Sequence, residues 1–300
     1  MKKQGYIVMV GFEVWPGPME GVGSDEFALA VQKLRLTSRW MTPFIRLTDV
    51  VPGKRKLFHK ISSYLQSGIP LIVQLMGSDP ELLAQCGRIL LDDPRISGIN
   101  LNLGCPSQRV VKHHAGGGLL KDPAAAVDLC IKTASLLPEG KVSVKLRSGF
   151  ADPEDMRKIL PAISQSGKIA KIFFHYRTVT EAYDSAAKKY REERIAEAVR
   201  LCGRTPLIAN GDISSVVEAQ ALVETTGCAG VMIARPWMRD PFLLRRFSGD
   251  ETAPEEGREK FMSVLRQCGV GGGALIEMAK MLWGCDSSQF KALIKDGKEE

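Results

Sequence analysis

Short apolar runs recur along the chain, and between them lie stretches whose apolar residues have helical spacing. The runs have the length of strands, which are predicted at Val14–Met19, Trp40–Ile45, Pro70–Leu75, Gly98–Leu103, Val142–Leu146, Ile172–His175, Pro206–Ala209 and Gly230–Ile233. Helices are predicted between them at Asp25–Leu36, Pro80–Leu91, Pro123–Leu137, Pro153–Ser166, Arg191–Cys202 and Val216–Thr226. Because the runs are apolar throughout, the strands are expected to be parallel and buried on both faces.

This alternation predicts an α/β fold, the (β/α)8 TIM barrel. Such a barrel needs about 250 residues, and the chain has 300. A doubly wound open sheet is the alternative, but no GxGxxG motif follows an early strand. The barrel is expected to span residues 1–247, and residues 248–300 are expected to hold a polar linker, Ser248–Gly257, and a small helical tail, Arg258–Lys295.

Composition and charge narrow the class of protein. Hydrophobic residues make up 44% of the chain and charged residues 25%, which excludes a disordered or fibrous protein. No apolar run approaches the roughly 18 residues that a membrane span needs, so no membrane partner is expected. Lys and Arg number 41 against 34 Asp and Glu, giving a net charge of +7. A basic surplus favours phosphate-rich partners, although many basic enzymes bind no nucleic acid.

The cysteines and histidines indicate neither disulfides nor a metal site. The seven cysteines form no CxxC pair, and the four histidines include no pair at metal-ligand spacing. We therefore expect no metal and a reducing, cytoplasmic location. A lone cysteine is usually an inert core residue. Cys105 differs because it follows a predicted strand and lies near Arg109, Lys112 and His113, where a thiol can act as an acid or a nucleophile. The residues alone leave both interpretations open.

Polar residues follow the later strands, at the rim where a barrel carries its chemistry. Lys145 and Arg147 alternate along one strand, so both can point to one side. A lysine inside a barrel mouth needs a partner or a bound anion. Asn210-Gly211-Asp212 and Ala234-Arg235 follow the last two strands, where such barrels commonly bind phosphate. Each of these segments alone could also be an ordinary turn or a surface charge.

Several motifs together resemble one family, in its order and approximate spacing. They are Asn102-Leu103-Gly104-Cys105-Pro106, Leu119-Leu120-Lys121-Asp122-Pro123, Lys145-Leu146-Arg147, His175-x-Arg177-Thr178, Asn210-Gly211-Asp212-Ile213 and Gly230-Val231-Met232-Ile233-x-Arg235. From about Pro18 to Phe247 the chain resembles the bacterial tRNA-dihydrouridine synthases. Pro18-Met19-Glu20-Gly21-Val22 and Phe44-Ile45-Arg46 are most similar to the C-type branch, which acts at position 16 of the D-loop.

The resemblance implies an FMN enzyme that reduces the C5=C6 bond of a tRNA uridine with NADPH. Hydride would reach C6, and Cys105 would protonate C5 as the catalytic acid. The target base would have to leave the stack to enter the site. By motif position, the residues around the flavin ring would be Pro18, Met19, Glu20, Gln74, Asn102 and Lys145. The ribityl and phosphate contacts would be His175, Asn210, Gly211, Asp212, Ala234 and Arg235.

Basic residues beside the predicted site are candidates for binding tRNA. They are Lys54, Arg55, Lys56, Arg109, Lys112, Arg147 and Arg177, although charge runs are more often simply solvated faces. The helical tail is a possible tRNA-binding domain, shorter than the corresponding domain in the family. Tyr176 stands where the family usually has Gly, and Ala234-Arg235-Pro236 replaces a usual Gly-Arg-Gly.

Two alternatives remain open at this stage. The first is another FMN barrel that reduces a small pyrimidine, of the dihydroorotate dehydrogenase type. The second is a catalytically weakened family member that binds RNA, which the altered motifs and short tail suggest. In each case we expect a monomer.

Overall fold

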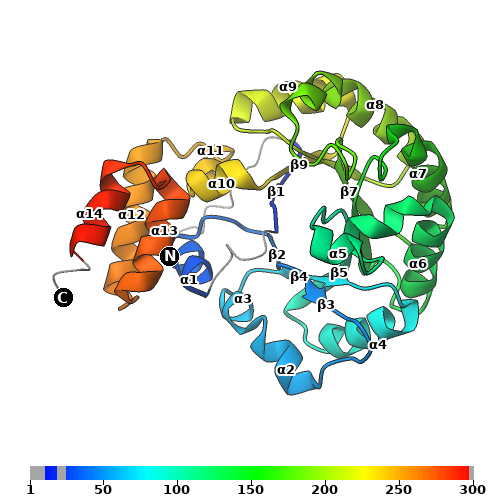
Figure 1. Cartoon of the computed structure of the whole chain (residues 1–300), viewed down its shortest axis with the longest axis horizontal. Coiled ribbons are helices and arrows are strands. Elements are labelled where there is room, and N and C mark those ends of the chain that lie inside the picture. The colour runs from blue at the N-terminus through cyan, green and yellow to red at the C-terminus, as the bar shows by residue number, and fades with distance from the viewer. Residues whose placement is uncertain (1–10, 19–24, 297–300) are drawn as a thin grey trace, which may run out of the picture.

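The structure is a computed structural model that describes residues 11–18 and 25–296, and a parallel sheet lies at its centre (Figure 1). The strands are β1 (Glu13–Pro16), β2 (Trp40–Met41), β3 (Ile45–Arg46), β4 (Leu71–Met76), β5 (Ile96–Leu103), β6 (Val142–Arg147), β7 (Lys171–His175), β8 (Leu207–Asn210) and β9 (Gly230–Ile233). Their order is β1-β9-β8-β7-β6-β5-β4-β2, with β3 also paired to β4. Because β1 and β2, at the two ends of this order, are in contact, the sheet forms a nearly closed barrel, and the predicted fold is confirmed.

One predicted strand is divided. The run Trp40–Ile45 was expected to be continuous, but it forms the separate strands β2 and β3. Pro43 lies between them, and proline has no backbone N–H with which to continue the ladder. The prediction of a single strand is therefore wrong at this point. Met19, the last residue of the first predicted strand, lies outside the described residues.

Helices surround the barrel and carry the connections between strands (Figure 1). They are α1 (Asp25–Leu34), α2 (Lys54–His59), α3 (Ser62–Gln66), α4 (Pro80–Leu91), α5 (Gln108–Val111), η1 (Gly116–Lys121), α6 (Pro123–Ser135), η2 (Pro153–Asp155), α7 (Met156–Gln165), η3 (Ser185–Tyr190), α8 (Arg191–Cys202) and α9 (Val216–Thr226). The bounds of α4, α8 and α9 agree with the prediction. α4 starts sharply because the Asp79 side chain accepts hydrogen bonds from the N–H groups of Glu81 and Leu82. α2 and α3 are short and were not predicted.

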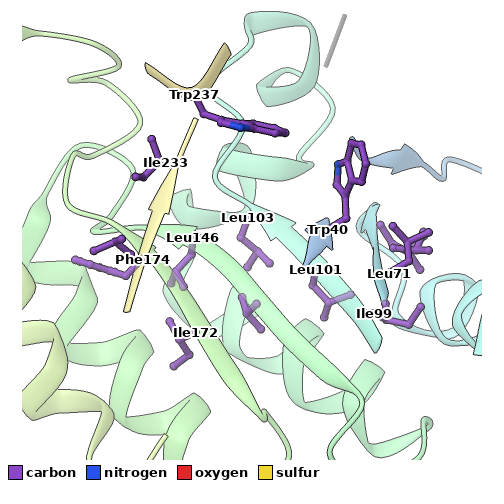
Figure 2. Close-up of a cluster of buried hydrophobic side chains, with 14 of the residues drawn as sticks. Trp40, Leu71, Ile99, Leu101, Leu103, Leu146, Ile172, Phe174, Ile233 and Trp237 are labelled. Atoms are coloured by element: carbon purple, nitrogen blue, oxygen red, sulfur yellow. The ribbon is translucent and has the colours of Figure 1, made fainter. Parts of the chain in front are cut away.

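Apolar side chains pack on both the outer and the inner face of the barrel wall. On β7, Ile172 and Phe174 point outward and pack with residues of the surrounding helices (Figure 2). Phe173, between them, belongs to a distinct inner cluster with Trp15 and Met232. This alternation is the period of two that a strand imposes on its side chains. The barrel interior is therefore filled by side chains in its middle layer, and chemistry is confined to its ends.

Charged side chains close the amino-terminal end of the barrel. Glu13, the first residue of β1, accepts hydrogen bonds from Arg39, from Lys171 Nζ at 2.5 and 2.7 Å and from Trp15 Nε1 at 2.7 Å. Lys171 begins β7 and Arg39 directly precedes β2, so these contacts span the barrel opening. This cluster lies at the end of the barrel opposite the carboxyl ends of the strands.

The chain ends in α10 (Arg235–Arg239), α11 (Leu243–Arg246), α12 (Pro254–Gln267), α13 (Gly272–Trp283) and α14 (Ser288–Asp296), the last three forming a bundle beside α1 (Figure 1). The rings of Phe27 on α1 and Phe261 on α12 lie 5.3 Å apart. α12 already starts at Pro254, so the predicted linker to Gly257 is too long. The boundary at residue 247 and the tRNA-binding role of the tail stay predictions. No helix in the described part of the chain is long and apolar enough to cross a membrane.

Candidate active site

A cavity of about 610 Å³ opens where the strands end. Its walls include residues from the carboxyl ends of β1, β4, β5, β6, β7, β8 and β9. The residues predicted for the ring side of the site line it, namely Pro18, Gln74, Asn102, Cys105, Lys145 and the neighbouring Arg147. The residues predicted for the phosphate side line it too, namely His175, Asn210, Gly211, Asp212, Ala234 and Arg235. Met19 and Glu20 lie outside the described residues.

A chain of amides crosses the floor of the cavity. Asn102 Nδ2 donates to Gln74 Oε1 at 2.8 Å, and Gln74 Nε2 donates to Asn100 Oδ1 at 2.8 Å. Asn100 Nδ2 continues the chain to Ser143 Oγ at 2.9 Å. These buried amides are thereby satisfied and fixed in orientation. Sequence reasoning missed Asn100 and Ser143, although their alternation with apolar neighbours marks them as facing the barrel interior.

Cys105 lies in a loop that its neighbours hold in place. Asn102 Oδ1 accepts hydrogen bonds from the backbone N–H groups of Gly104 at 3.0 Å and Cys105 at 3.1 Å. Behind the loop, Gly117 N donates to Cys105 O at 3.0 Å, and a Cβ on Gly117 would lie 2.8 Å from that oxygen. The glycine-rich segment was expected to permit close approach to a substrate. In the structure its glycines instead permit close packing against the Cys105 loop.

Lys145 is a largely buried cation in the cavity wall. Among the described residues, no hydrogen bond or ion pair reaches its Nζ. Burial, and then the like charge of Arg147, lower the pKa of Lys145 from 10.5 to about 8, against the opposing effect of Cys105. A buried ammonium without a partner is costly, and a bound anion would relieve that cost. Lys145 is therefore suited to face a negatively charged part of a ligand.

Arg147 lines the cavity, but much of its guanidinium serves the protein itself. Nε donates to Gly104 O at 2.9 Å, and Nη1 donates to Thr178 O at 2.8 Å and Ala182 O at 3.1 Å. Burial lowers the pKa of Arg147 from 12.5 to about 10. These contacts tie the Cys105 loop to the loop after β7. The predicted contact of Arg147 with substrate stays a prediction.

The turn after β8 has an unusual backbone. Gly211 has a φ of 119° and Asp212 a φ of 51°, both in the region that favours glycine.

His175, at the end of β7, is a neutral ring in the cavity wall. Burial, and then the positive charge of Arg147, hold the pKa of His175 well below its ordinary value. His175 Nδ1 accepts the Arg177 backbone N–H at 3.2 Å, which leaves Nε2 as the donor.

The Asp212 carboxylate is held from several sides. Tyr176 Oη donates to Asp212 Oδ2 at 2.5 Å, and Arg177 Nη2 lies 2.6 Å from the same oxygen. Arg235 Nη2 lies 3.3 Å from Oδ1. Burial would raise the pKa of Asp212, but the hydrogen bonds from Arg177 and Tyr176 outweigh it, so the pKa falls below its ordinary value.

Arg177 is almost fully buried and is not part of the cavity wall. Its Nε donates to Asp184 O at 2.8 Å, and its Nη2 pairs with Asp212. The structure shows Arg177 supporting Asp212, and its predicted contact with a substrate stays a prediction. Tyr183 does line the cavity: its ring is exposed there, and the Arg235 guanidinium lies over it at 4.6 Å. Sequence reasoning missed Tyr183, whose signal is an aromatic residue in a loop after a strand.

The predicted basic residues lie in two different places. Arg109 and Lys112 are exposed beside α5, directly after the Cys105 loop. Lys54 Nζ lies 3.8 Å from Asp92 Oδ2, and Asp92 follows α4 and precedes β5. The start of α2 therefore lies near the amino end of β5, away from the cavity. Lys54, Arg55 and Lys56 are exposed, and their predicted contact with tRNA stays a prediction.

Comparison of the sequence with models of known protein families shows which family the chain belongs to. The model of the Dihydrouridine synthase family matches residues 16–282. The chain belongs to the dihydrouridine synthase family. It is therefore an oxidoreductase, and the predicted resemblance is confirmed. The match continues through α12 and most of α13, beyond the predicted boundary at residue 247.

Curated members of the dihydrouridine synthase family resemble most of the chain. The tRNA-dihydrouridine(16) synthase of Vibrio cholerae is 30% identical over 234 residues, which are 76% of this chain and 71% of that protein. The enzyme of the same name from Vibrio parahaemolyticus is 32% identical over 236 residues, with 76% and 71% covered.

Solved structures share the fold at much lower identity. The old yellow enzyme of Trypanosoma cruzi matches with a TM-score of 0.54 and 7% identity, covering 83% of this chain and 94% of that one. A structure titled TcOYE with pHBA matches with a TM-score of 0.57 and 9% identity, covering 83% and 95%. At such low identity these likenesses concern the barrel architecture alone.

Proposed function

We propose that this member of the dihydrouridine synthase family is a tRNA-dihydrouridine synthase that uses FMN and NADPH. Its substrate would be a uridine in the D-loop of tRNA, and position 16 is favoured because the Vibrio relatives carry that position in their names. The reaction adds a hydride to C6 and a proton to C5 of the uracil, so the C5=C6 double bond becomes a single bond and NADPH becomes NADP⁺. We further infer that the enzyme acts as a monomer in the cytoplasm.

The observation that carries this proposal is that Cys105 and Lys145 line one cavity at the strand ends. Lys145 is a half-buried cation whose Nζ has no hydrogen-bond or ion-pair partner among the described residues, and Cys105 is a thiol in a fixed loop. The reaction needs these two chemical properties together. A cation stabilises negative charge on a reduced ring, and a positioned thiol supplies a proton.

The cavity residues fit FMN. The amides of Gln74 and Asn102 can pair with the edge of a heterocycle, since an amide both donates and accepts. At the other side, Gly211 lines the cavity, and a Cβ there would lie 2.7 Å from Tyr176 Cε1, so the turn packs on that ring too closely for any residue but glycine. Arg235 lines the same side and is a cation suited to one phosphate group. Bound FMN would supply the hydride that the substrate accepts at C6.

The chain's own groups would control the proton and the approach of the base. Cys105 would donate its thiol proton to C5, from a loop that Asn102 and Gly117 hold in position. Tyr183 presents an exposed ring at the mouth, which suits stacking with an unstacked base.

The RNA would approach the carboxyl-terminal face of the barrel. Arg109 and Lys112 lie there and can neutralise phosphates close to the flipped base. The α12–α14 bundle packs beside α1 and offers a second surface for the body of the tRNA. We therefore keep the tail as part of the proposed RNA-binding surface.

The decisive experiment is single-turnover oxidation of the reduced enzyme. Purified protein is reconstituted with FMN or FAD, reduced with NADPH, and mixed with unmodified tRNA, free uracil or orotate. We expect FMN alone to bind, and only tRNA to reoxidise the flavin. Reoxidation by orotate would favour the small-pyrimidine alternative, and tight tRNA binding without turnover would favour the weakened member. Mapping dihydrouridine in tRNA from a deletion strain would then identify the position.

A further inference from the structure

Tyr176 lies directly beneath the turn formed by Asn210, Gly211 and Asp212. It is fully buried, and its ring stacks on that of His175 with centroids 5.4 Å apart and 10° between the planes. A Cβ on Gly211 would lie 2.7 Å from Tyr176 Cε1, so the ring and the turn are in close contact. Where the family usually has glycine, this chain therefore places an aromatic ring and a hydroxyl group.

The hydroxyl of Tyr176 helps to hold the turn after β8. Gly211 and Asp212 both have positive φ values, a conformation that glycine adopts freely and aspartate more readily than most other residues. Contacts to both the backbone and the side chain of Asp212 fix this turn. Arg191 Nη1 donates to Asp212 O at 2.7 Å, and Tyr176 Oη and Arg177 Nη2 share Asp212 Oδ2. Backbone and side chain of Asp212 are thus fixed at the same time.

Arg235 is the exposed member of this group. Its side chain is 51% exposed and lines the cavity, whereas the Arg177 side chain is only 2% exposed. Arg235 contacts Asp212 Oδ1 at 3.3 Å and rests on the ring of Tyr183 at 4.6 Å. The orientation of the Asp212 carboxylate therefore influences where the Arg235 guanidinium stands along the cavity wall.

We propose that the Tyr176 hydroxyl is a positioning group for phosphate binding: by fixing the Asp212 carboxylate, it keeps Arg235 at the phosphate end of the cavity. This inference rests on the proposed function, because it assigns the phosphate of FMN to that end. Without the hydroxyl, Asp212 Oδ2 keeps only Arg177, and the carboxylate can turn towards a bound phosphate. Arg235 at the same time loses its fixed acceptor. Both effects weaken binding of a phosphate and leave the ring side unchanged.

Two flavins that differ only by the phosphate separate this role from simple packing. Flavin-free protein is titrated with FMN and with riboflavin, and binding is followed by the loss of flavin fluorescence. We expect Tyr176→Phe to weaken FMN binding roughly 3- to 30-fold, since a hydrogen bond to a charged group is lost and acts through the turn. Riboflavin binding should change by less than about twofold, because it has no phosphate to lose. Tyr190→Phe, the same change at an exposed tyrosine, should alter neither.

A double-mutant cycle tests whether Tyr176 acts through Asp212. Asp212→Asn should change FMN binding and leave riboflavin binding unchanged, and adding Tyr176→Phe to it should cause little further change. Equal weakening of FMN and riboflavin by Tyr176→Phe, or full additivity in the cycle, would overturn the proposal. Wild-type protein that binds neither flavin would instead contradict the proposed function. Asp212→Asn also keeps the test available if Tyr176→Phe should fail to fold.

Discussion

Gly17 and Ala234 share a space with room for only one methyl group. A Cβ on Gly17 would lie 2.5 Å from the Cβ of Ala234 and 3.0 Å from its Cα. The two residues follow β1 and β9, which pair in parallel, and Gly17 N donates to Ile233 O at 2.7 Å. Both residues line the cavity. The methyl group of Ala234 is therefore accommodated by the absence of a side chain on Gly17.

This relationship predicts a compensating pair of substitutions. Gly17→Ala should lower the free energy of unfolding by about 1–3 kcal/mol, the usual cost of overpacking, and should reduce FMN retention. Ala234→Gly should restore most of both losses in the double variant, because it removes the atom that Gly17→Ala meets. Urea unfolding of the four proteins in a double-mutant cycle measures the coupling. If Gly17→Ala lowers the free energy of unfolding equally in the presence of Ala234 and of Gly at position 234, the two residues do not compete for the same space.

Lys145 should make the flavin-free protein less stable at neutral pH. Its pKa is lowered to about 8 in the folded state from 10.5, so between these values the unfolded chain binds more protons. The free energy of unfolding therefore rises with pH between about 8 and 10.5. Below pH 8 the lysine is charged in both states, and the folded protein bears the whole destabilisation that its charge causes. Lys145→Met should stabilise the flavin-free protein by roughly 1–3 kcal/mol at pH 7, with a smaller gain near pH 10.5.

The same variant should bind flavin less well, because the cation that would offset charge on the ring is gone. Urea unfolding with and without FMN at pH 7 and pH 10 measures both effects. The prediction fails if Lys145→Met destabilises the flavin-free protein at pH 7, or if its gain in stability is independent of pH. Lys141→Met, at an exposed lysine just before the same strand, is the matched control and should show neither effect.

The two basic clusters should contribute unequally to tRNA binding. Arg109 and Lys112 lie beside the Cys105 loop, whereas Lys54 lies beside Asp92 near the amino end of β5. Arg109→Glu with Lys112→Glu should weaken tRNA binding and reduce the slope of log affinity against log salt by about 1 to 2. Charge reversal at residues 54–56 should change that slope less. Filter binding over a range of salt concentrations checks this, and a larger effect of residues 54–56 would refute it.

Local signals in the sequence were sufficient for much of the barrel. The Asp79-Pro80 pair and the apolar spacing after it define α4 at both ends, because capping and periodicity act within a few residues. Lys145 and Arg147 both line the cavity as their alternation predicted. The division of the predicted strand Trp40–Ile45 into β2 and β3 also has a local cause, because Pro43 lacks a backbone N–H.

Contacts between distant segments could not be predicted in this way. The position of Lys54 depends on the path of the chain from β3 to α2, which brings it to Asp92. Arg177 is buried behind the cavity wall, where it contacts the Asp184 carbonyl and the Asp212 carboxylate, and no local pattern indicates the pairing with Asp212. The sequence could identify which residues lie at the rim, but which of them face the cavity depends on partners far along the chain.

Cys105 is expected to donate the proton that completes the reaction. Hydride addition at C6 leaves carbanion character at C5, and general acid catalysis typically contributes about 10²- to 10⁴-fold. Cys105→Ala should keep FMN, tRNA affinity and reduction by NADPH, because the loop is fixed through backbone contacts. Flavin oxidation by unmodified tRNA should slow by roughly that factor, and Cys105→Ser should slow it nearly as much because a hydroxyl is far less acidic.

Two buried cysteines serve as controls. Burial raises the pKa of the Cys86 and Cys130 thiols to about 12, so Cys86→Ala and Cys130→Ala should leave this step unchanged. A single-turnover rate for Cys105→Ala within a few-fold of wild type would exclude Cys105 as the acid and leave His113 or His114, which lie exposed in the same loop, as the next candidates.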